Sequence, residues 1–160
     1  MKKLLATVLV LVIAISLTAC AAQPKEFSES GMTITLTTSF FENTQGGYTV
    51  CYDSANVAVF VLKESFSLQA GLGDMSLDDY AALVRTSNAS KSPSAISKAD
   101  GLTSMEYSFE NTSENKTYKY FCTMFKGPDA FWLVQFATLE DKYDELLPTL
   151  KEYAKSVVFE

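Results

Sequence analysis

The stretch Ala130-Phe131-Trp132-Leu133-Val134-Gln135-Phe136-Ala137 decides the fold. It is apolar except for one glutamine, and its length suits a strand better than a helix. Consecutive side chains of a strand point to opposite faces, so Phe131 and Trp132 would lie on different sides. Both faces then carry large apolar groups. We therefore predict a central strand that is covered on both sides.

A second stretch, Val57 to Leu62, is also apolar on both faces and predicts another covered strand. Farther along the chain, Leu102 to Phe109 and Thr117 to Phe125 alternate apolar and polar residues on either side of a polar tip. That pattern is typical of an antiparallel hairpin. The strands therefore belong to a largely antiparallel sheet.

Two amphipathic helices are expected. Ser76 stands three residues before Asp79, the spacing of a capping box, and an apolar stripe follows. Thr138 and Asp141 repeat that spacing before the second helix, and Pro148 should kink or split this helix near Leu147. Strands covered on both faces together with two such helices predict an α+β fold, an antiparallel sheet sandwiched between helices.

The N-terminal segment has the layout of a secretory signal peptide. Lys2 and Lys3 precede an apolar run from Leu4 to Leu17. An uncleaved membrane anchor is the alternative, but this run is shorter than the roughly 20 residues of a spanning helix. The sequence Leu17-Thr18-Ala19-Cys20 resembles the lipobox of bacterial lipoproteins. The resemblance implies cleavage before Cys20 and a diacylglycerol thioether on its sulfur.

Three segments are therefore expected. Residues 1–19 are the lipoprotein signal peptide, residues 20–30 are a lipidated tether, and residues 31–160 form a single domain. Residues 21–30 are predicted as tether because they are polar, contain Pro24 and show no periodicity.

Charge narrows the classes of partner. The chain has 13 basic and 19 acidic residues, and loss of Lys2 and Lys3 leaves 11 basic residues and a formal charge of −8. An acidic surface argues against nucleic acid and against electrostatic docking on anionic lipid. The expected membrane contact is through the lipid on Cys20.

Composition also argues against catalysis. The chain has no histidine, the commonest metal ligand and general base, and no Gly-x-Ser-x-Gly elbow. Acidic pairs such as Asp78/Asp79 fall in the first turns of helices, where carboxylates favour the helix dipole. We expect no enzyme activity, no cofactor and no metal. Cys51 and Cys122 fit buried free thiols, although a disulfide between them stays open.

The order of predicted elements resembles the PsbP-like group, which includes many bacterial lipoproteins. The opening Gly31-Met32-Thr33-Ile34 strand, the helix from Ser76, the meander from Leu102 to Thr138 and the ending Ser156-Val157-Val158-Phe159 carry the likeness. The resemblance implies a three-layer α/β/α fold and a binding or scaffolding role. It supplies no ligand.

Two sets of residues are candidate contact sites. The loop from Ser65 to Met75 has apolar side chains among glycines, and these either anchor the loop in the core or contact a partner: Phe66, Leu68 and Leu72. Five tyrosines could line a carbohydrate- or peptide-binding face, although packing beneath a helix is the commoner role of such residues: Tyr48, Tyr52, Tyr107, Tyr118 and Tyr120.

The function expected from these observations is a non-catalytic, lipid-anchored binding or scaffolding module. It would act on the extracytoplasmic face of a bacterial cell membrane and bind a protein or envelope component. The alternative is a solute-binding or sensing lipoprotein with a small-molecule pocket against the sheet.

Overall fold

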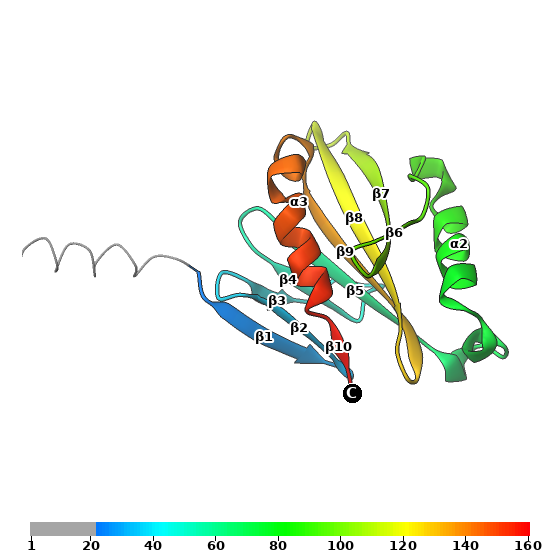
Figure 1. Cartoon of the computed structure of the whole chain (residues 1–160). Coiled ribbons are helices and arrows are strands. Elements are labelled where there is room, and N and C mark those ends of the chain that lie inside the picture. The colour runs from blue at the N-terminus through cyan, green and yellow to red at the C-terminus, as the bar shows by residue number, and fades with distance from the viewer. Residues whose placement is uncertain (1–21) are drawn as a thin grey trace, which may run out of the picture.

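The computed structural model describes residues 22–160. The predicted signal peptide and Cys20 lie outside the described residues. Within the described part of the chain, no helix is long and apolar enough to cross a membrane. The chain forms an α+β fold with mostly antiparallel sheets and, among residues 22–160, two α-helices (Figure 1).

The main sheet has seven strands in the order β3-β4-β5-β9-β8-β7-β6. Their bounds are β3 Phe41–Asn43, β4 Val50–Asp53, β5 Ala58–Ser65, β6 Ser97–Ala99, β7 Leu102–Asn111, β8 Lys116–Lys126 and β9 Ala130–Leu139. Strand β9 pairs with β5 on one side and with β8 on the other, both antiparallel. Its residues from Ala130 to Thr138 are all buried. The prediction of a central strand here is confirmed.

A second, three-stranded sheet was not expected. It has the order β1-β2-β10, with β1 Pro24–Glu29, β2 Met32–Thr37 and β10 Val158–Phe159. Residues 24–29 are therefore a strand and not an irregular tether, which corrects the expected domain start at residue 31. Only Phe27 of β1 is buried, because β1 is an edge strand, and so the segment lacks the alternation that marks a strand in sequence.

Two hydrophobic cores lie on opposite faces of the main sheet. On one face, Trp132 and Phe136 pack with Leu150 of α3 (Glu140–Lys155) and with Ile34 of the small sheet. On the other face, Phe131 packs with residues of α2 (Leu77–Ser87). Three short 3₁₀ turns complete the chain: Phe66–Leu68, Leu72–Asp74 and Ala89–Lys91. Residues of α3 thus belong to the first core, which they share with the second sheet, and residues of α2 belong to the other core (Figure 1).

Phe131 and Trp132 point to opposite faces, as the alternation predicts. The ring of Phe131 stacks on Tyr80 of α2 with the centroids 4.2 Å apart. Trp132 shares its core with Leu150 of α3. Its ring also stacks on Phe159 of β10 at 5.5 Å, and the ammonium of Lys63 lies 5.0 Å from it. The C-terminal strand therefore supplies the ring that stacks on the sole tryptophan.

The helix ends test the capping predictions. Ser76 Oγ accepts a hydrogen bond from the Asp79 N–H at 3.1 Å and donates one to Asp79 Oδ2 at 2.6 Å, so the first box is confirmed. The second is wrong, because β9 continues to Leu139 and Thr138 is a buried strand residue. Pro148 does not split α3, which runs through it unbroken.

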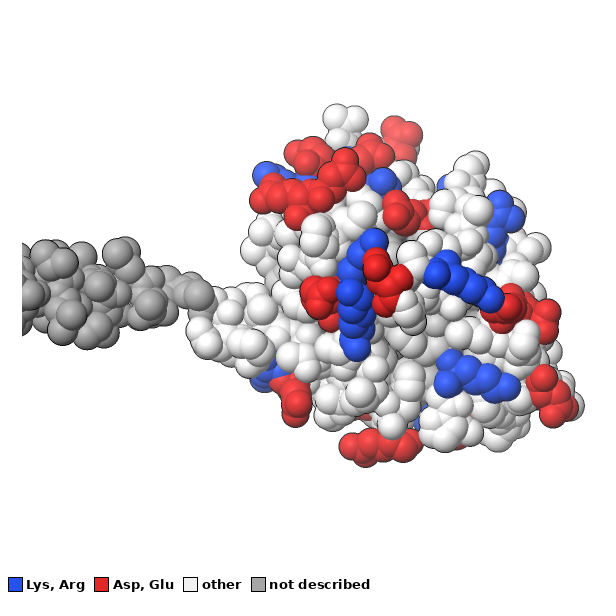
Figure 2. Space-filling view, in the orientation of Figure 1, with Lys and Arg blue, Asp and Glu red and all other residues white. Residues whose placement is uncertain are grey.

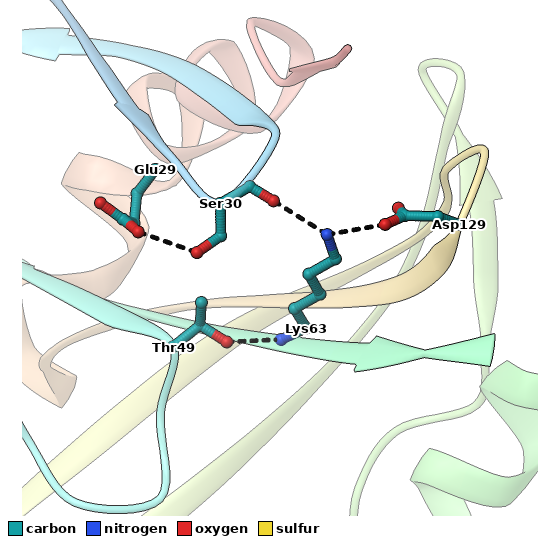
Figure 3. A network of polar contacts seen from close by, with 5 residues as sticks. All are labelled: Glu29, Ser30, Thr49, Lys63 and Asp129. Atoms are coloured by element: carbon teal, nitrogen blue, oxygen red, sulfur yellow. Dashed lines mark hydrogen bonds and ion pairs between the residues drawn. The ribbon is translucent and has the colours of Figure 1, made fainter. Parts of the chain in front are cut away.

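Lys63 of β5 joins the two sheets (Figure 3). Its Nζ donates to the backbone oxygen of Ser30 at 2.9 Å and pairs with Asp129 Oδ2 at 2.9 Å. Ser30 lies in the β1–β2 turn and Asp129 in the β8–β9 loop. The Lys63 side chain is 18% exposed and that of Asp129 is 61% exposed, so solvent partly screens the ion pair. This contact fixes the turn of the small sheet against the main sheet.

Candidate functional site

The structure separates the three apolar residues of the predicted contact loop. Phe66 packs edge-on against Phe131 at 5.3 Å, and Leu72 is buried in the core on the α2 face. Both anchor the loop. Leu68 is 80% exposed and remains free for a contact. The structure thus brings the loop onto the core without forming a cavity from these three side chains.

The five candidate tyrosines do not share one face. Tyr52 is buried in the core on the α3 face, where its ring contacts Phe27 at 5.0 Å. The other four lie on the α2 face. Tyr107 is buried there, whereas Tyr48, Tyr118 and Tyr120 are half-buried. The core interpretation therefore holds for Tyr52 and Tyr107, and the remaining three are partly accessible.

A hollow of about 490 Å³ lies where α2 leaves the sheet uncovered. Helix α2 packs over β7 and β8 near Met105 and Met124, toward the Ala130 end of β9. At the opposite end of the sheet the floor is open. We call this space the sheet-end hollow, and its apolar lining comprises Ala55, Val57, Ala58, Phe60, Phe109, Tyr118, Tyr120, Ala137 and Leu139.

Two rings of the floor, Phe60 and Tyr120, belong to a row of rings that crosses four strands or their ends. Phe60 contacts Tyr48 at 5.0 Å and Tyr120 at 6.4 Å, and Tyr120 stacks on Tyr107 at 4.7 Å. Because Tyr120 lies between two rings, its edge and hydroxyl are the parts left for a ligand. The edge of an aromatic ring carries positive partial charge and attracts oxygen atoms.

The buried side chain of Gln135 lies next to this row of rings and is hydrogen-bonded to Tyr107. Gln135 of β9 accepts a hydrogen bond from the Tyr107 hydroxyl at 2.8 Å and a weak one from Cys122 Sγ at 3.8 Å. Burial raises the pKa of the Cys122 thiol to about 12 and also raises the pKa of Tyr107 and Tyr120. These groups therefore stay neutral near neutral pH, and the sheet beneath the hollow is uncharged at these positions.

The rim of the hollow is polar. It is formed by amides, one hydroxyl and three charged side chains from the β3–β4 loop, the β4–β5 turn, the β7–β8 hairpin and the start of α3: Gln45, Ser54, Asn56, Asn111, Glu114, Lys116 and Lys142. Glu114 pairs with Lys116 at 3.6 Å and accepts a hydrogen bond from the Tyr118 hydroxyl at 3.0 Å, which raises the pKa of that phenol. Phe109 and Leu139 at the margin are 44% and 37% exposed.

The acidic pairs lie where the helix-dipole interpretation puts them. Asp78 and Asp79 occupy the first turn of α2, and Glu140 and Asp141 that of α3. Figure 2 shows acidic side chains gathered over the first turns of α3. Among residues 22–160, no three His, Cys, Asp or Glu side chains form a group that could hold a metal ion. Cys51 and Cys122 are both buried free cysteines, as predicted.

Sequence reasoning found two aromatic residues of the hollow, Tyr118 and Tyr120, but not the hollow itself. Phe60 and Phe109 were assigned only as strand residues. The pairing register of the hairpin indicates that Phe109 lies beside the candidate tyrosines, because Phe109 is opposite Tyr118 and Tyr107 is opposite Tyr120. That register could be drawn from the hairpin pattern, but how far α2 reaches over the sheet could not.

No protein-family model matches the sequence, and no curated protein sequence matches it either. Solved structures do match. The solution structure of cyanobacterial PsbP (CyanoP) from Synechocystis sp. PCC 6803 aligns with a TM-score of 0.58 at 11% identity, over 89% of this chain and 95% of that chain. The fold is PsbP-like.

A crystal structure of a protein from Bacteroides thetaiotaomicron VPI-5482 aligns with a TM-score of 0.57 at 13% identity. It covers 86% of this chain and 49% of that longer chain. At such identities the likeness concerns the PsbP-like fold alone. The resemblance expected from the order of elements is thus confirmed for the fold.

Proposed function

We propose that this protein is a lipid-anchored, non-catalytic binding module on the extracytoplasmic face of a bacterial cell membrane. In this proposal the helix–sheet–helix domain is a scaffold, and the sheet-end hollow binds a segment of a protein partner. The observation that carries the binding role is the hollow, with its aromatic floor and amide rim. The anchor is supported by Leu17-Thr18-Ala19-Cys20, which lies outside the described residues.

The chemistry of the hollow suits a polypeptide. Ring edges and phenol hydroxyls on the floor attract carbonyl oxygens, and the rim amides of Asn56 and Asn111 can both donate to and accept from a peptide backbone. The exposed side chains of Phe109 and Leu139 offer apolar contacts beside it. Convergent apolar and polar groups of this kind are the usual composition of a binding site.

A small solute is the second candidate, because about 490 Å³ falls within the usual range of small-molecule sites, roughly 300 to 1,000 Å³. Such sites usually bury 70–90% or more of the ligand. The partly exposed Phe109 and Leu139 show that the margin of this hollow is open to solvent. An open margin favours a segment that continues beyond the hollow.

Photo-crosslinking in the producing cells tests the proposal. A benzophenone amino acid placed at Phe109 should give a discrete crosslinked protein, because this residue stands at the margin of the hollow. The matched control is the same probe at Leu83, which is 49% exposed on α2 and does not line the hollow. Identical products at both positions, or none at Phe109, would contradict a protein partner. Native mass spectrometry of the purified chain then tests the solute alternative through a released small molecule.

The anchor is tested separately. We expect Cys20→Ser to abolish incorporation of labelled fatty acid and to move the protein into the soluble fraction. Cys51→Ala is the control, because this buried thiol plays no part in the proposed anchor, and it should still be labelled. Retention of Cys20→Ser on the membrane with processing at residue 19 would show that the lipoprotein assignment is wrong.

A further inference from the structure

The point where the described chain enters the domain is held firmly. Gln23 accepts a backbone hydrogen bond from the Thr38 N–H at 2.7 Å, and its own N–H donates to Thr38 Oγ1 at 3.2 Å. Pro24 then opens β1, which pairs in register with β2. The position of residue 23, three residues after Cys20, is therefore fixed beside the loop that follows β2.

Six exposed residues near this point are uncharged and include one large apolar side chain, and the exposed Lys25 and Glu42 border them. We call this surface the exit patch, and it comprises the exposed residues Ala22, Gln23, Pro24, Thr38, Ser39 and Phe41. Phe41 is 60% exposed, whereas its neighbour Phe40 is buried. Residues 30–41 contain no Asp, Glu, Lys or Arg. Figure 2 shows uncharged surface beside the start of the described chain, with basic and acidic side chains at its lower margin.

The length of chain between Cys20 and the exit patch limits where a bilayer can lie. Consecutive Cα atoms are 3.8 Å apart, so residue 23 lies at most about 11 Å from Cys20. A lipid on Cys20 therefore holds the exit patch at the membrane surface. An uncharged surface approaches anionic headgroups without the repulsion that the acidic remainder of the domain would meet.

We propose that the exit patch is the membrane-facing surface of the domain and that Phe41 inserts at the lipid interface. This inference rests on the proposed anchor at Cys20 and is independent of what the hollow binds. An aromatic side chain buried at the boundary of headgroups and acyl chains adds apolar area to the attachment. It also gives the anchored domain one preferred orientation.

Two other exposed apolar residues lie away from the exit patch and serve as controls. Leu68, 80% exposed, follows Ser65 and Phe66, and the Phe66 N–H donates to Asp129, near the Lys63 contact at the far end of β1. Leu83, 49% exposed, belongs to α2 on the opposite face of the main sheet. Neither side chain can face the bilayer when the exit patch does.

The test uses tryptophan emission and vesicles of phosphatidylcholine that contain brominated lipid, a contact quencher. The chain from Cys20 to Glu160 is coupled through the Cys20 thiol to a maleimide lipid, which is selective because Cys51 is 1% and Cys122 0% exposed. Three single variants supply the reporters: Phe41→Trp, Leu68→Trp and Leu83→Trp. Trp132, 1% exposed, is an internal emitter that the lipid does not reach.

We expect Phe41→Trp to lose most of its added emission on brominated vesicles, while Leu68→Trp and Leu83→Trp keep theirs. A Ser39→Trp reporter on the same patch should follow Phe41→Trp, which guards against a local distortion. Equal quenching at all positions would mean a freely tumbling domain, and stronger quenching at Leu68 or Leu83 would mean another orientation. Either result, or no quenching at Phe41, overturns the proposal. Because the coupling is chemical, none of these results depends on natural lipidation or on the partner of the hollow.

Discussion

Replacing Trp132 with alanine should destabilise the domain strongly, because the ring belongs to the core between the main sheet and α3. The ring is 1% exposed and stacks on Phe159, and the Lys63 ammonium lies 5.0 Å from it. Truncating a buried tryptophan costs about 3–5 kcal/mol. Loss of the cation–π contact adds about 0.5–2 kcal/mol.

The unpaired N–H of the Trp132 indole reduces the loss of unfolding free energy on truncation. Among the described residues, the buried indole Nε1 of Trp132 has no hydrogen-bond partner. A buried unpaired donor costs about 1–3 kcal/mol, and the truncation removes it. The net destabilisation is therefore about 3 kcal/mol. Trp132→Phe removes the same N–H and keeps most of the ring, so its unfolding free energy should stay within about 1.5 kcal/mol of the parent.

Urea unfolding followed by far-ultraviolet circular dichroism measures both variants, since fluorescence is lost with the tryptophan. With a slope of about 2 kcal/mol/M, the midpoint for Trp132→Ala should fall by roughly 1.5 M. The parent should emit at short wavelength and resist quenching by iodide. Red-shifted emission that iodide quenches easily, together with an alanine variant as stable as the parent, would refute the two-sided core.

Three further predictions follow from the same packing. A Cβ on Gly127 would lie 3.0 Å from the Trp132 Nε1 atom, which is packed too tightly to yield, so Gly127→Ala should lower the unfolding free energy by about 1–3 kcal/mol. Cys51 and Cys122 should both react with a thiol reagent in denaturant and neither in the native state, whereas a mass two units below the reduced form would reveal a disulfide. Burial raises the pKa of Cys122 and of Tyr52 to about 12, so above about pH 9 the unfolded chain loses protons that the folded chain keeps, and stability should fall as pH rises toward 12. Urea midpoints measured between pH 7 and 11 test this slope, and a flat profile would contradict the burial of these groups.

The parts of the fold that could be predicted from the sequence are those with strong local patterns, such as strand alternation and helix-cap spacing. The alternation of Phe131 and Trp132 placed β9 between two cores, and the Ser76/Asp79 spacing located the start of α2. The failures have local causes too. Thr138 offered a helix cap, but pairing of β9 with β8 extends to Leu139 and takes that residue into the strand. Residues 24–29 show no alternation because β1 has a single buried side chain.

The sheet-end hollow was harder to predict because it lies where no helix covers the main sheet. Tyr118 and Tyr120 were chosen as aromatics on a strand, which says nothing about whether a helix lies above them. Tyr52 matched them in composition and lies on the other face. The hollow exists because α2 covers only part of its side of the sheet, and a helix's position over a sheet depends on long-range packing that periodicity does not contain.

The arrangement of β5, β9 and β10 has a consequence for the order in which the chain can fold. Strand β5 pairs with β9, Ala58 opposite Ala137, and β2 pairs with β10, whose last residue Phe159 precedes the C-terminal Glu160. Contacts between residues distant in sequence form slowly, because the intervening loop must first be closed. The main sheet cannot be completed before β9 has been made, and the small sheet cannot be completed before β10 has been made. Strand β10 is therefore a late addition to the fold, and deletion of Val158 and Phe159 should leave the small sheet without its third strand and the Trp132 ring without its stacking partner.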